Sequence, residues 1–446
     1  MPATVFDSAA GRDLWHDADT ARLFGDGAEI RAMLLVWGAL AEAQGALGVI
    51  PETAAAAIQR AAHEIAVDPA SLSAETGANG VLVPALAAAV RAAMQAPEHS
   101  QYLHWGATSQ DIVDTALALR LRRCLTIWQE RLDATLDALA RLARQHAETP
   151  MAGRTWGLAA APISFGAVVA GWGWPVLRQV DRLDRLRPEV LCVSLSGAAG
   201  TLSILHPHGP AIRRRIAEAM DLGDPGTGWH AARDGIAGLA AWTTTTLTVL
   251  AKMGADLELM AQTDPPEIAL PGAGASSTMP QKRNPVQPAQ LRALAALARG
   301  LNAPLQGAAE ARQQRDGAAW MTEWLALPPL AHAMGRATLL ARDLAAGIAP
   351  DADAMAAAVD GGAGLIHAEA LSFALAQEMP RPEAQALVKR LCRQAAETGT
   401  PLADLMAAER PGRDWAAVAR APGRLGTAPD DARAFAAAVD ARRTAG

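Results

Sequence analysis

Aromatic residues are scarce in this sequence, and their scarcity argues against a fold built from sheets. The 446 residues include twelve Trp but only five Phe and one Tyr, so aromatics make up 4% of the chain. Alanine and leucine carry much of the 51% hydrophobic fraction, and both favour close-packed helices over strands. The length allows two or three domains with a large core. We therefore predict an all-α protein.

Cysteine is also rare. Cys124, Cys192 and Cys392 are odd in number and far apart, which excludes a disulfide framework and the close spacing of metal-binding cysteines. This usage favours a reducing compartment. His206-Pro207-His208 looks like a pair of metal ligands, but no Asp, Glu or Cys stands at a useful spacing, so a surface loop is the better interpretation. We expect neither a metal nor a cofactor.

Long apolar runs and an excess of basic residues are absent as well. The run Leu239–Leu250 is short and interrupted by four threonines, so no transmembrane segment is expected. The first fifteen residues lack the charged and apolar regions of a signal peptide, and we expect a cytoplasmic protein. The net charge of −6 argues against a nucleic-acid partner.

Polar donors are densest in 272–286, which reads GAGASSTMPQKRNPV. Its glycines and prolines are incompatible with a regular helix or strand. Lys282 lies eight residues after Gly274 and is followed by Arg283, which excludes a nucleotide P-loop. Such a stretch is often a solvated surface connection, but connections within helical chains are normally short, and this one is rich in donors. We predict a loop that closes on a small anion.

A second polar stretch, HWGATSQD over 104–111, precedes a run without Pro or Gly that extends to Glu148. The run predicts a helix of about 40 residues, roughly 60 Å long. Thr108 or Ser109 is a suitable N-cap, and Asp111 suits the first turn. The free N–H groups of such a helix start form a natural carboxylate site. His104 alone would be interpreted as a satisfied buried histidine.

The remaining pattern predicts further long helices, short helices near both ends, and a few irregular connections. The long helices are expected over 162–185, 229–262, 288–301 and 317–344. We interpret 76–80 as a polar turn and both 94–100 and 149–157 as loops. The chain is accordingly divided into an N-terminal helical domain (1–104), a central long-helix bundle (105–348) and a small C-terminal helical domain (349–446).

Three stretches resemble one known superfamily. SSTMPQKRNP over 276–285 resembles the SSxMPxKxNP loop of the fumarase/aspartase superfamily, although Ala275 stands where most members have Gly. HWGATSQDIVDTA resembles its second conserved region, and GRTWGLAAAPISFG occupies the place of the third. The resemblance implies three all-helical domains, a central five-helix bundle that assembles into a homotetramer, and active sites built from three subunits.

Within the superfamily, HWGATSQDIVDTAL, SGAAGTL and the pairs Ala319-Trp320 and Glu323-Trp324 resemble the 3-carboxy-cis,cis-muconate cycloisomerases. This implies closure of 3-carboxy-cis,cis-muconate to a carboxymuconolactone, in the protocatechuate branch of β-ketoadipate aromatic degradation, with a small tricarboxylate as substrate. Adenylosuccinate lyases instead carry a His after Arg-Thr. Trp156 stands there in this chain and cannot exchange a proton at neutral pH.

Trp156 separates the alternatives chemically. An amine-releasing lyase needs a general base and a general acid, whereas addition of a substrate carboxylate to its own diene needs one proton transfer. Trp156 therefore disfavours an adenylosuccinate-type or amino-acid lyase, unless it is simply a core residue. A non-catalytic protein, as in the eye-lens crystallins of this superfamily, is disfavoured by the intact Ser276, Lys282 and Asn284.

The resemblance maps the family's catalytic serine onto Ser276, whose alkoxide Lys282 and loop amides would stabilise. Lys282, Asn284 and the helix start would stabilise the enolate-like intermediate. Arg154 and Arg315 are candidates for the other carboxylates, and either is alternatively a structural ion-pair partner. The predicted catalytic residues are Ser276, Lys282 and His104, and the predicted substrate-binding residues are Thr108, Ser109, Arg154, Thr155, Trp156, Ser277, Met279, Asn284 and Arg315.

Overall fold

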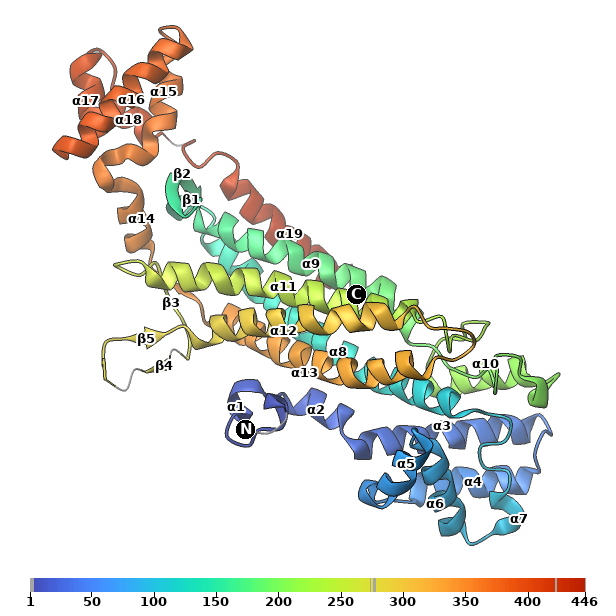
Figure 1. Cartoon of the computed structure of the whole chain (residues 1–446). Helices are drawn as coiled ribbons and strands as arrows, with labels where there is room; N and C mark the ends of the chain where they lie inside the picture. Colours follow the sequence, from blue (N-terminus) through green and yellow to red (C-terminus); the bar gives the residue numbers. More distant parts are fainter. Residues whose placement is uncertain (1–3, 273, 276–277, 422, 446) are drawn as a thin grey trace. The chain divides into compact units, whose positions relative to one another are not determined.

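The computed structural model is mainly helical, as predicted, and describes residues 4–272, 274–275, 278–421 and 423–445 (Figure 1). It divides into two compact units. The first comprises 1–131, 179–248 and 293–339, and the second comprises 132–178, 249–292 and 340–446. The division falls within five long helices, each of which contributes a segment to both units. The three-domain division based on the sequence stays a prediction.

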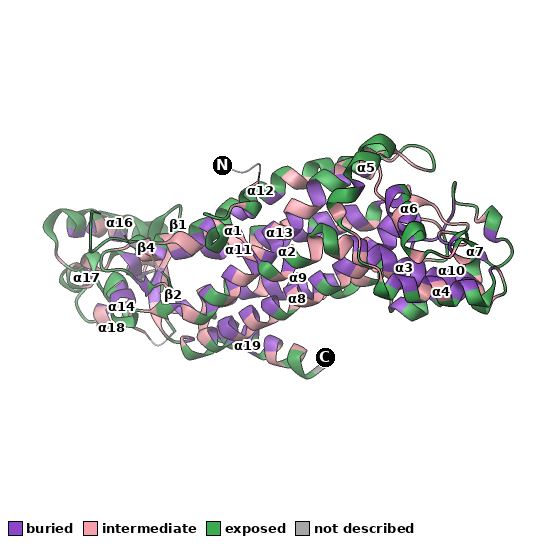
Figure 2. Ribbon diagram, turned by 90° about the horizontal axis from the view of Figure 1, so that it is seen from below, coloured by how far each residue is buried: buried purple, intermediate pink, exposed green. Residues whose placement is uncertain are grey.

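The five long helices have the bounds α8 (Ser109–Gln145), α9 (Phe165–Val190), α11 (Asp234–Gln262), α12 (Val286–Ala308) and α13 (Gly317–Gly347). All five were expected, and the structure shifts only their ends. Pro304 lies inside α12, and Pro328 and Pro329 lie inside α13. Buried and exposed positions recur along these helices, as bundle packing requires (Figure 2).

The first unit also contains shorter helices, several of which bury one common core. The core includes Trp37, Leu86 and Ile112, all almost fully buried. Segments of the long helices pack beside it, where Trp128 stacks on Trp242 with ring centroids 6.5 Å apart. The short helices are η1 (Val5–Asp7), α1 (Arg12–Trp15), α2 (Ala18–Phe24), α3 (Asp26–Ala46), α4 (Glu52–Glu64), η2 (Pro69–Leu72), α5 (Ser73–Asn79), α6 (Val83–Met94), α7 (Pro97–Ser100), η3 (Ser203–Leu205) and α10 (Gly209–Met220).

The second unit adds three two-stranded antiparallel sheets and a C-terminal group of helices. The sheets pair β1 (Pro150–Thr155) with β2 (Leu158–Ser164), β3 (Ile268–Ala269) with β6 (Ala349–Pro350), and β4 (Gly274–Ala275) with β5 (Arg283–Asn284). The helices are α14 (Ala352–Asp360), η4 (Gly362–His367), α15 (Ala368–Leu375), α16 (Arg381–Thr398), α17 (Leu402–Glu409), α18 (Trp415–Ala419) and α19 (Ala428–Ala445).

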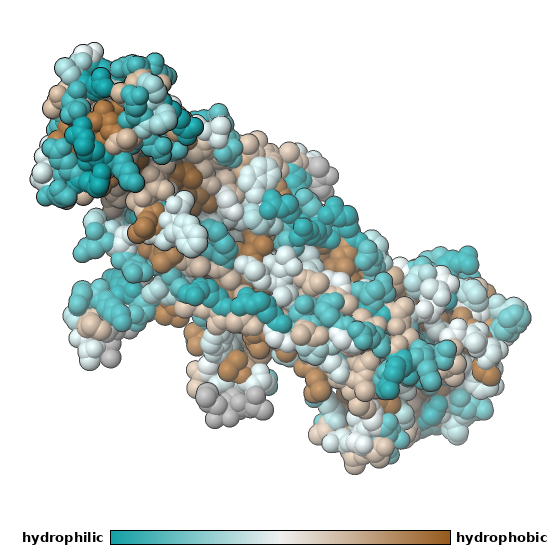
Figure 3. Space-filling model, turned by 45° about the horizontal axis from the view of Figure 1, so that its top comes forward, coloured by the Kyte–Doolittle hydropathy of each residue, from teal (hydrophilic) through white to brown (hydrophobic). Residues whose placement is uncertain are grey.

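Helices α15 to α18 enclose a small core of their own. Leu371, Leu391, Met406 and Trp415 are among its buried residues. The outer surface of this cluster is mainly hydrophilic (teal in Figure 3, upper left). The pattern of shorter helices expected after residue 348 is therefore present, with a hydrophobic interior of its own.

Local predictions were wrong at four places. The polar turn at 76–80 is mostly the end of α5, which Gly80 terminates in the left-handed region at φ 69°. The loop at 94–100 contains α7, because Pro97 suits the first turn of a helix, where no N–H is needed. The stretch 272–286 contains the short strands β4 and β5. Gly274 permits the close approach of β4 to the start of α12, since a Cβ there would lie 2.8 Å from Val286 Cγ2.

The loop predicted at 149–157 is largely the first strand of a hairpin. Trp156 and Gly157 form a two-residue turn between the paired Thr155 and Leu158, and both turn residues have positive φ, 55° and 79°. Two positive φ angles match the twist of antiparallel strands, and glycine adopts one of them without strain. The strand β2 consequently occupies the start of the helix expected from Pro162, so that α9 begins at Phe165.

Candidate active site

The predicted site residues fall into two groups, one in each unit. His104, Thr108, Ser109 and Arg315 belong to the first unit. The others belong to the second, where Ser276 and Ser277 lie outside the described residues.

His104 lies in the turn before α8 and is held by the core of the first unit. Its backbone is left-handed, with φ 66°. The Trp37 indole N–H donates a hydrogen bond to His104 Nδ1 at 3.0 Å. Since Nδ1 accepts, the neutral ring carries its proton on Nε2. Burial lowers the pKa of His104 to about 4, although Asp111 opposes the shift. At neutral pH His104 is therefore an uncharged hydrogen-bond donor.

Asp111, in the first turn of α8, anchors the site of the first unit. Its side chain is 0% exposed. Oδ2 accepts from the Thr108 amide at 2.9 Å and the Gly197 amide at 3.1 Å. Oδ1 accepts from the Ser196 amide at 2.7 Å and lies 2.8 Å from His230 Nε2. One carboxylate thus links the start of α8 to the turn at 196–197 through hydrogen bonds. Sequence reasoning assigned Asp111 only to a favourable charge in the first turn of the helix, and it missed the hydrogen bonds that the turn at 196–197 donates to this carboxylate.

Arg315 belongs to the same cluster, but its hydrogen bonds go to neutral groups and not to the Asp111 carboxylate. Its Nε donates to Gln110 Oε1 at 2.9 Å, and its Nη2 donates to the Ala198 carbonyl at 3.2 Å. Gln110 in turn donates to the His230 carbonyl at 2.9 Å. Among the described residues, Arg315 has no carboxylate partner. A half-buried guanidinium beside a helix N-terminus is suited to bind an anion.

A buried ion network lies one turn further along α8. Arg233 donates to Asp114 at 2.7 and 3.2 Å and to Glu323 Oε1 at 2.8 Å. Burial alone would lower the pKa of Arg233, but the two carboxylates raise it. Burial raises the pKa of Glu323. Sequence reasoning missed this network because its members are about 90 to 200 residues apart.

Arg154 is an ion-pair partner in the second unit. Its Nη1 and Nη2 donate to Glu267 at 3.0 and 2.7 Å, and the Glu267 side chain is 1% exposed. This bidentate geometry is that of a strong structural pair. Arg154 also lines a cavity of about 600 Å³ with Lys252, whose own partner is Asp256. The two candidate arginines therefore differ, because Arg154 is already paired with a carboxylate.

The hairpin and the loop present the remaining candidates on the surface of the chain. Thr155 and Trp156 are exposed, and the Trp156 side chain is fully so. The interpretation of Trp156 as a core residue is therefore wrong for this chain. Met279 and Lys282 are exposed, while Asn284 is half-buried on β5. The Lys282 amide donates to the Met279 carbonyl at 3.0 Å, which closes a turn between them.

The described residues contain no group of three or more His, Cys, Asp or Glu side chains placed to hold a metal ion. In the same part of the chain, no helix combines the length and the apolar character that crossing a membrane requires.

Comparison with known proteins identifies relatives along most of the chain. A family model described as "Lyase" matches residues 15–300. The 3-carboxy-cis,cis-muconate cycloisomerase of Pseudomonas aeruginosa is 37% identical over 380 residues, covering 84% of this chain and 83% of that protein. The nitrosuccinate lyase of Streptomyces davaonensis is 38% identical over 422 residues, covering 91% and 88%.

Solved structures of related enzymes have the same fold as this chain. The crystal structure of the 3-carboxy-cis,cis-muconate lactonizing enzyme from Pseudomonas putida superposes with a TM-score of 0.91 at 31% identity, covering 97% of this chain and 99% of that one. The all-α, fumarase/aspartase-like fold predicted from the sequence is thereby confirmed. The protein belongs to the lyase family of the fumarase/aspartase superfamily and is similar to its bacterial 3-carboxy-cis,cis-muconate cycloisomerases.

Proposed function

We propose that this protein is a cycloisomerase that converts 3-carboxy-cis,cis-muconate into a carboxymuconolactone. The proposal is carried by two ring side chains among the predicted site residues, His104 and Trp156, neither of which exchanges a proton near neutral pH. The pKa of His104 is lowered to about 4, and Trp156 replaces the histidine of the amine lyases. Ring closure fits such a site, because it needs only one proton transfer. Relatives named as this enzyme support the same assignment.

In the proposed reaction, a substrate carboxylate oxygen adds to the conjugated double bond and forms the lactone C–O bond. The electron pair of the double bond moves to the neighbouring carbon and is delocalised into the carboxylate attached there. Ser276 then gives a proton to that carbon, and water restores the serine proton. Lys282 and Asn284 stabilise the doubly charged intermediate and the serine alkoxide.

The first unit supplies binding groups for the substrate carboxylates. Arg315 and the amides around Thr108 and Ser109 provide positive charge and donors. His104 donates a hydrogen bond from Nε2. Arg154 acts through Glu267, holding the hairpin rather than meeting the substrate. We further propose a homotetramer in which these residues and the 276–284 loop come together from different subunits.

A substrate panel tests the assignment. Purified protein is incubated with 3-carboxy-cis,cis-muconate, adenylosuccinate and nitrosuccinate, and each product is identified by NMR. The proposal predicts turnover of the muconate and formation of one lactone, with no release of amine. Turnover of adenylosuccinate alone would overturn it. If no substrate is turned over, the melting temperature is measured with tricarboxylates present. A rise would indicate a binding site whose substrate was not in the panel, whereas no rise would indicate a protein that does not bind tricarboxylates.

The 38% identity to a nitrosuccinate lyase favours a second candidate, elimination from a nitro-substituted succinate. A weakly basic leaving group departs without a proton, so Trp156 is compatible with that reaction too. Elimination still requires a base to remove a proton from carbon. The nitrosuccinate arm of the panel separates the two candidates, because only the lyase would produce fumarate from it.

A further inference from the structure

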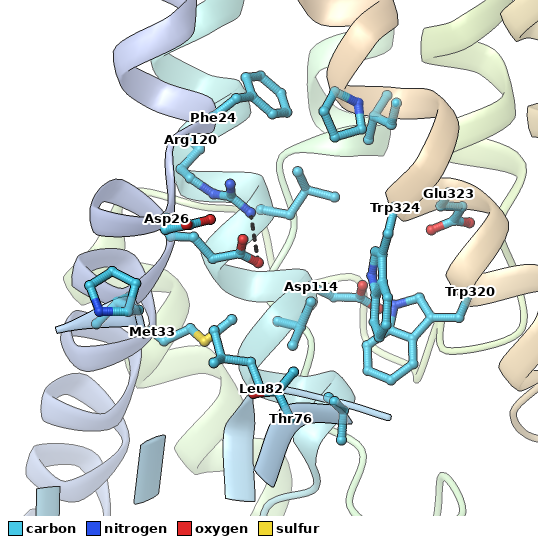
Figure 4. A pocket seen from close by; sticks show the side chains of 18 of the residues that line it. Phe24, Asp26, Met33, Thr76, Leu82, Asp114, Arg120, Trp320, Glu323 and Trp324 are labelled. Atoms are coloured by element: carbon cyan, nitrogen blue, oxygen red, sulfur yellow. Dashed lines mark ion pairs between the residues drawn. The ribbon is translucent and has the colours of Figure 1, made fainter. Parts of the chain in front are cut away.

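A cavity of about 390 Å³ in the first unit lies outside the candidate active site (Figure 4). Its walls come from α3, α8, α13 and the end of α2, with the segment 69–82 closing one side. The volume is within the range of small-molecule sites. None of the predicted catalytic or substrate-binding residues lines it, so the proposed reaction does not account for it.

The charged groups around the cavity are predominantly acidic. Asp26, Glu29, Asp114 and Glu323 line it, whereas Arg120 is the only basic residue on its walls among those described. Arg120 pairs with Glu29 at 3.4 Å (dashed in Figure 4). Arg233 forms ion pairs with both Asp114 and Glu323, but its single positive charge can neutralise only one of these two carboxylates. Asp26, exposed at the start of α3, has no ion-pair partner among the described residues.

Two indoles of α13 line the side that lies across from Asp26 and Arg120 (Figure 4). Trp320 and Trp324 have ring centroids 4.7 Å apart at 57°, and Figure 4 shows both beside the open volume. Indole faces attract cations, most strongly where water is excluded. Thr76 also lines the cavity, and its buried hydroxyl has no hydrogen-bond partner among the described residues. An unsatisfied buried hydroxyl indicates a position where a ligand donor would be satisfied.

We propose that this cavity binds a small organic ammonium ion with an aromatic or branched apolar body. The carboxylates attract the charge, the indoles and the apolar residues Met33 and Leu82 accept the body, and the Thr76 hydroxyl accepts a hydrogen bond from the ammonium group. The excess of carboxylates disfavours the tricarboxylate that we propose for the active site. The cavity is therefore a second site with the opposite charge preference.

Three ligands of matched shape test the charge preference: benzylammonium, benzyl alcohol and benzoate. Binding to the full chain is measured by calorimetry and by ligand-observed NMR. We expect benzylammonium to bind about tenfold more tightly than benzyl alcohol, and benzoate to bind most weakly. Equal affinities for the three ligands, or a preference for benzoate, would overturn the proposal. Muconate should not displace benzylammonium, and competition between them would place the cation in the active site instead.

Variants of residues in the cavity walls test whether benzylammonium binds in this cavity. Asp26→Asn is expected to weaken benzylammonium but not benzyl alcohol, while Trp324→Ala weakens both. Asp353→Asn, an exposed first-turn change on α14 away from the cavity walls, is the matched control and should change neither. Because Asp26 is exposed, its variant is expected to fold, so the test stands even if Trp324→Ala unfolds. Unchanged benzylammonium affinity in a folded Asp26→Asn would contradict the assignment.

Discussion

At the residue scale, His104 links the site to the stability of the protein. Its pKa in the folded chain is about 4, below the ordinary value of 6.5. The unfolded chain therefore takes up a proton first as the pH falls. Stability is full above about pH 6.5 and decreases toward pH 4, and the shift corresponds to about 3 kcal/mol. Burial lowers the pKa of His146, His332 and His367 in the same direction.

His104→Asn tests this linkage, because asparagine can still accept from Trp37 but does not titrate. Denaturant unfolding at pH 8, 6 and 5 should show a smaller loss of stability in the variant than in the parent. His63→Asn, on the exposed end of α4, is the control and should keep the parental slope. An identical pH slope for His104→Asn and the parent would show that His104 is not held neutral by the fold.

Trp156 gives a second residue-scale prediction. Trp156→His restores the residue of the amine lyases, and we expect a muconate rate that is similar or lower, because one proton transfer suffices. Since Trp156 is fully exposed in the chain, the melting temperature should stay within about 2 °C. A large gain in rate on the muconate would contradict the one-proton argument, because it would show that a second acid–base group was missing.

At the element scale, Asp111 holds the start of α8 against the turn at 196–197. Asp111→Ala would leave three amides without their acceptor and the buried His230 without its partner. We expect a loss of about 2–5 kcal/mol in stability, together with reduced turnover. Urea unfolding measures the loss. Asp353→Ala, on an exposed helix start, should lower the free energy of unfolding by less than about 1 kcal/mol. Equal losses for the two variants would show that Asp111 does not hold the start of α8 in place.

The sequence predicted the long helices, whose apolar residues recur at helical spacing. It did not predict the hairpin, which depends on pairing between two strands. All five long helices follow from the helical spacing of their apolar residues, and α8 also follows from a long stretch without Pro or Gly. The β1–β2 hairpin was missed because its turn places Trp156 at positive φ, which a tryptophan rarely adopts. At the site, Asp111 and Arg315 come together through contacts up to 205 residues apart in sequence, so no local pattern could reveal the cluster.

At the scale of the whole molecule, the proposed homotetramer shares its active sites between chains. His104→Ala and Ser276→Ala subunits, each inactive alone, are mixed, dissociated and reassembled. If the two residues belong to different subunits of one site, some sites in mixed tetramers regain both, and activity should return to a measurable fraction of the parent. Native mass spectrometry verifies the mixing, and verified mixed tetramers without activity would contradict shared sites.

The loss of diene absorbance when purified protein meets 3-carboxy-cis,cis-muconate tests the central claim most directly. The parent is compared with Ser276→Ala at equal concentration, after circular dichroism has shown that the variant is folded. We expect rapid loss with the parent and a rate at least about a hundredfold lower with the variant, because the proton donor is gone. No loss with the parent, or equal rates for both proteins, would contradict the proposed cycloisomerisation and its catalytic serine.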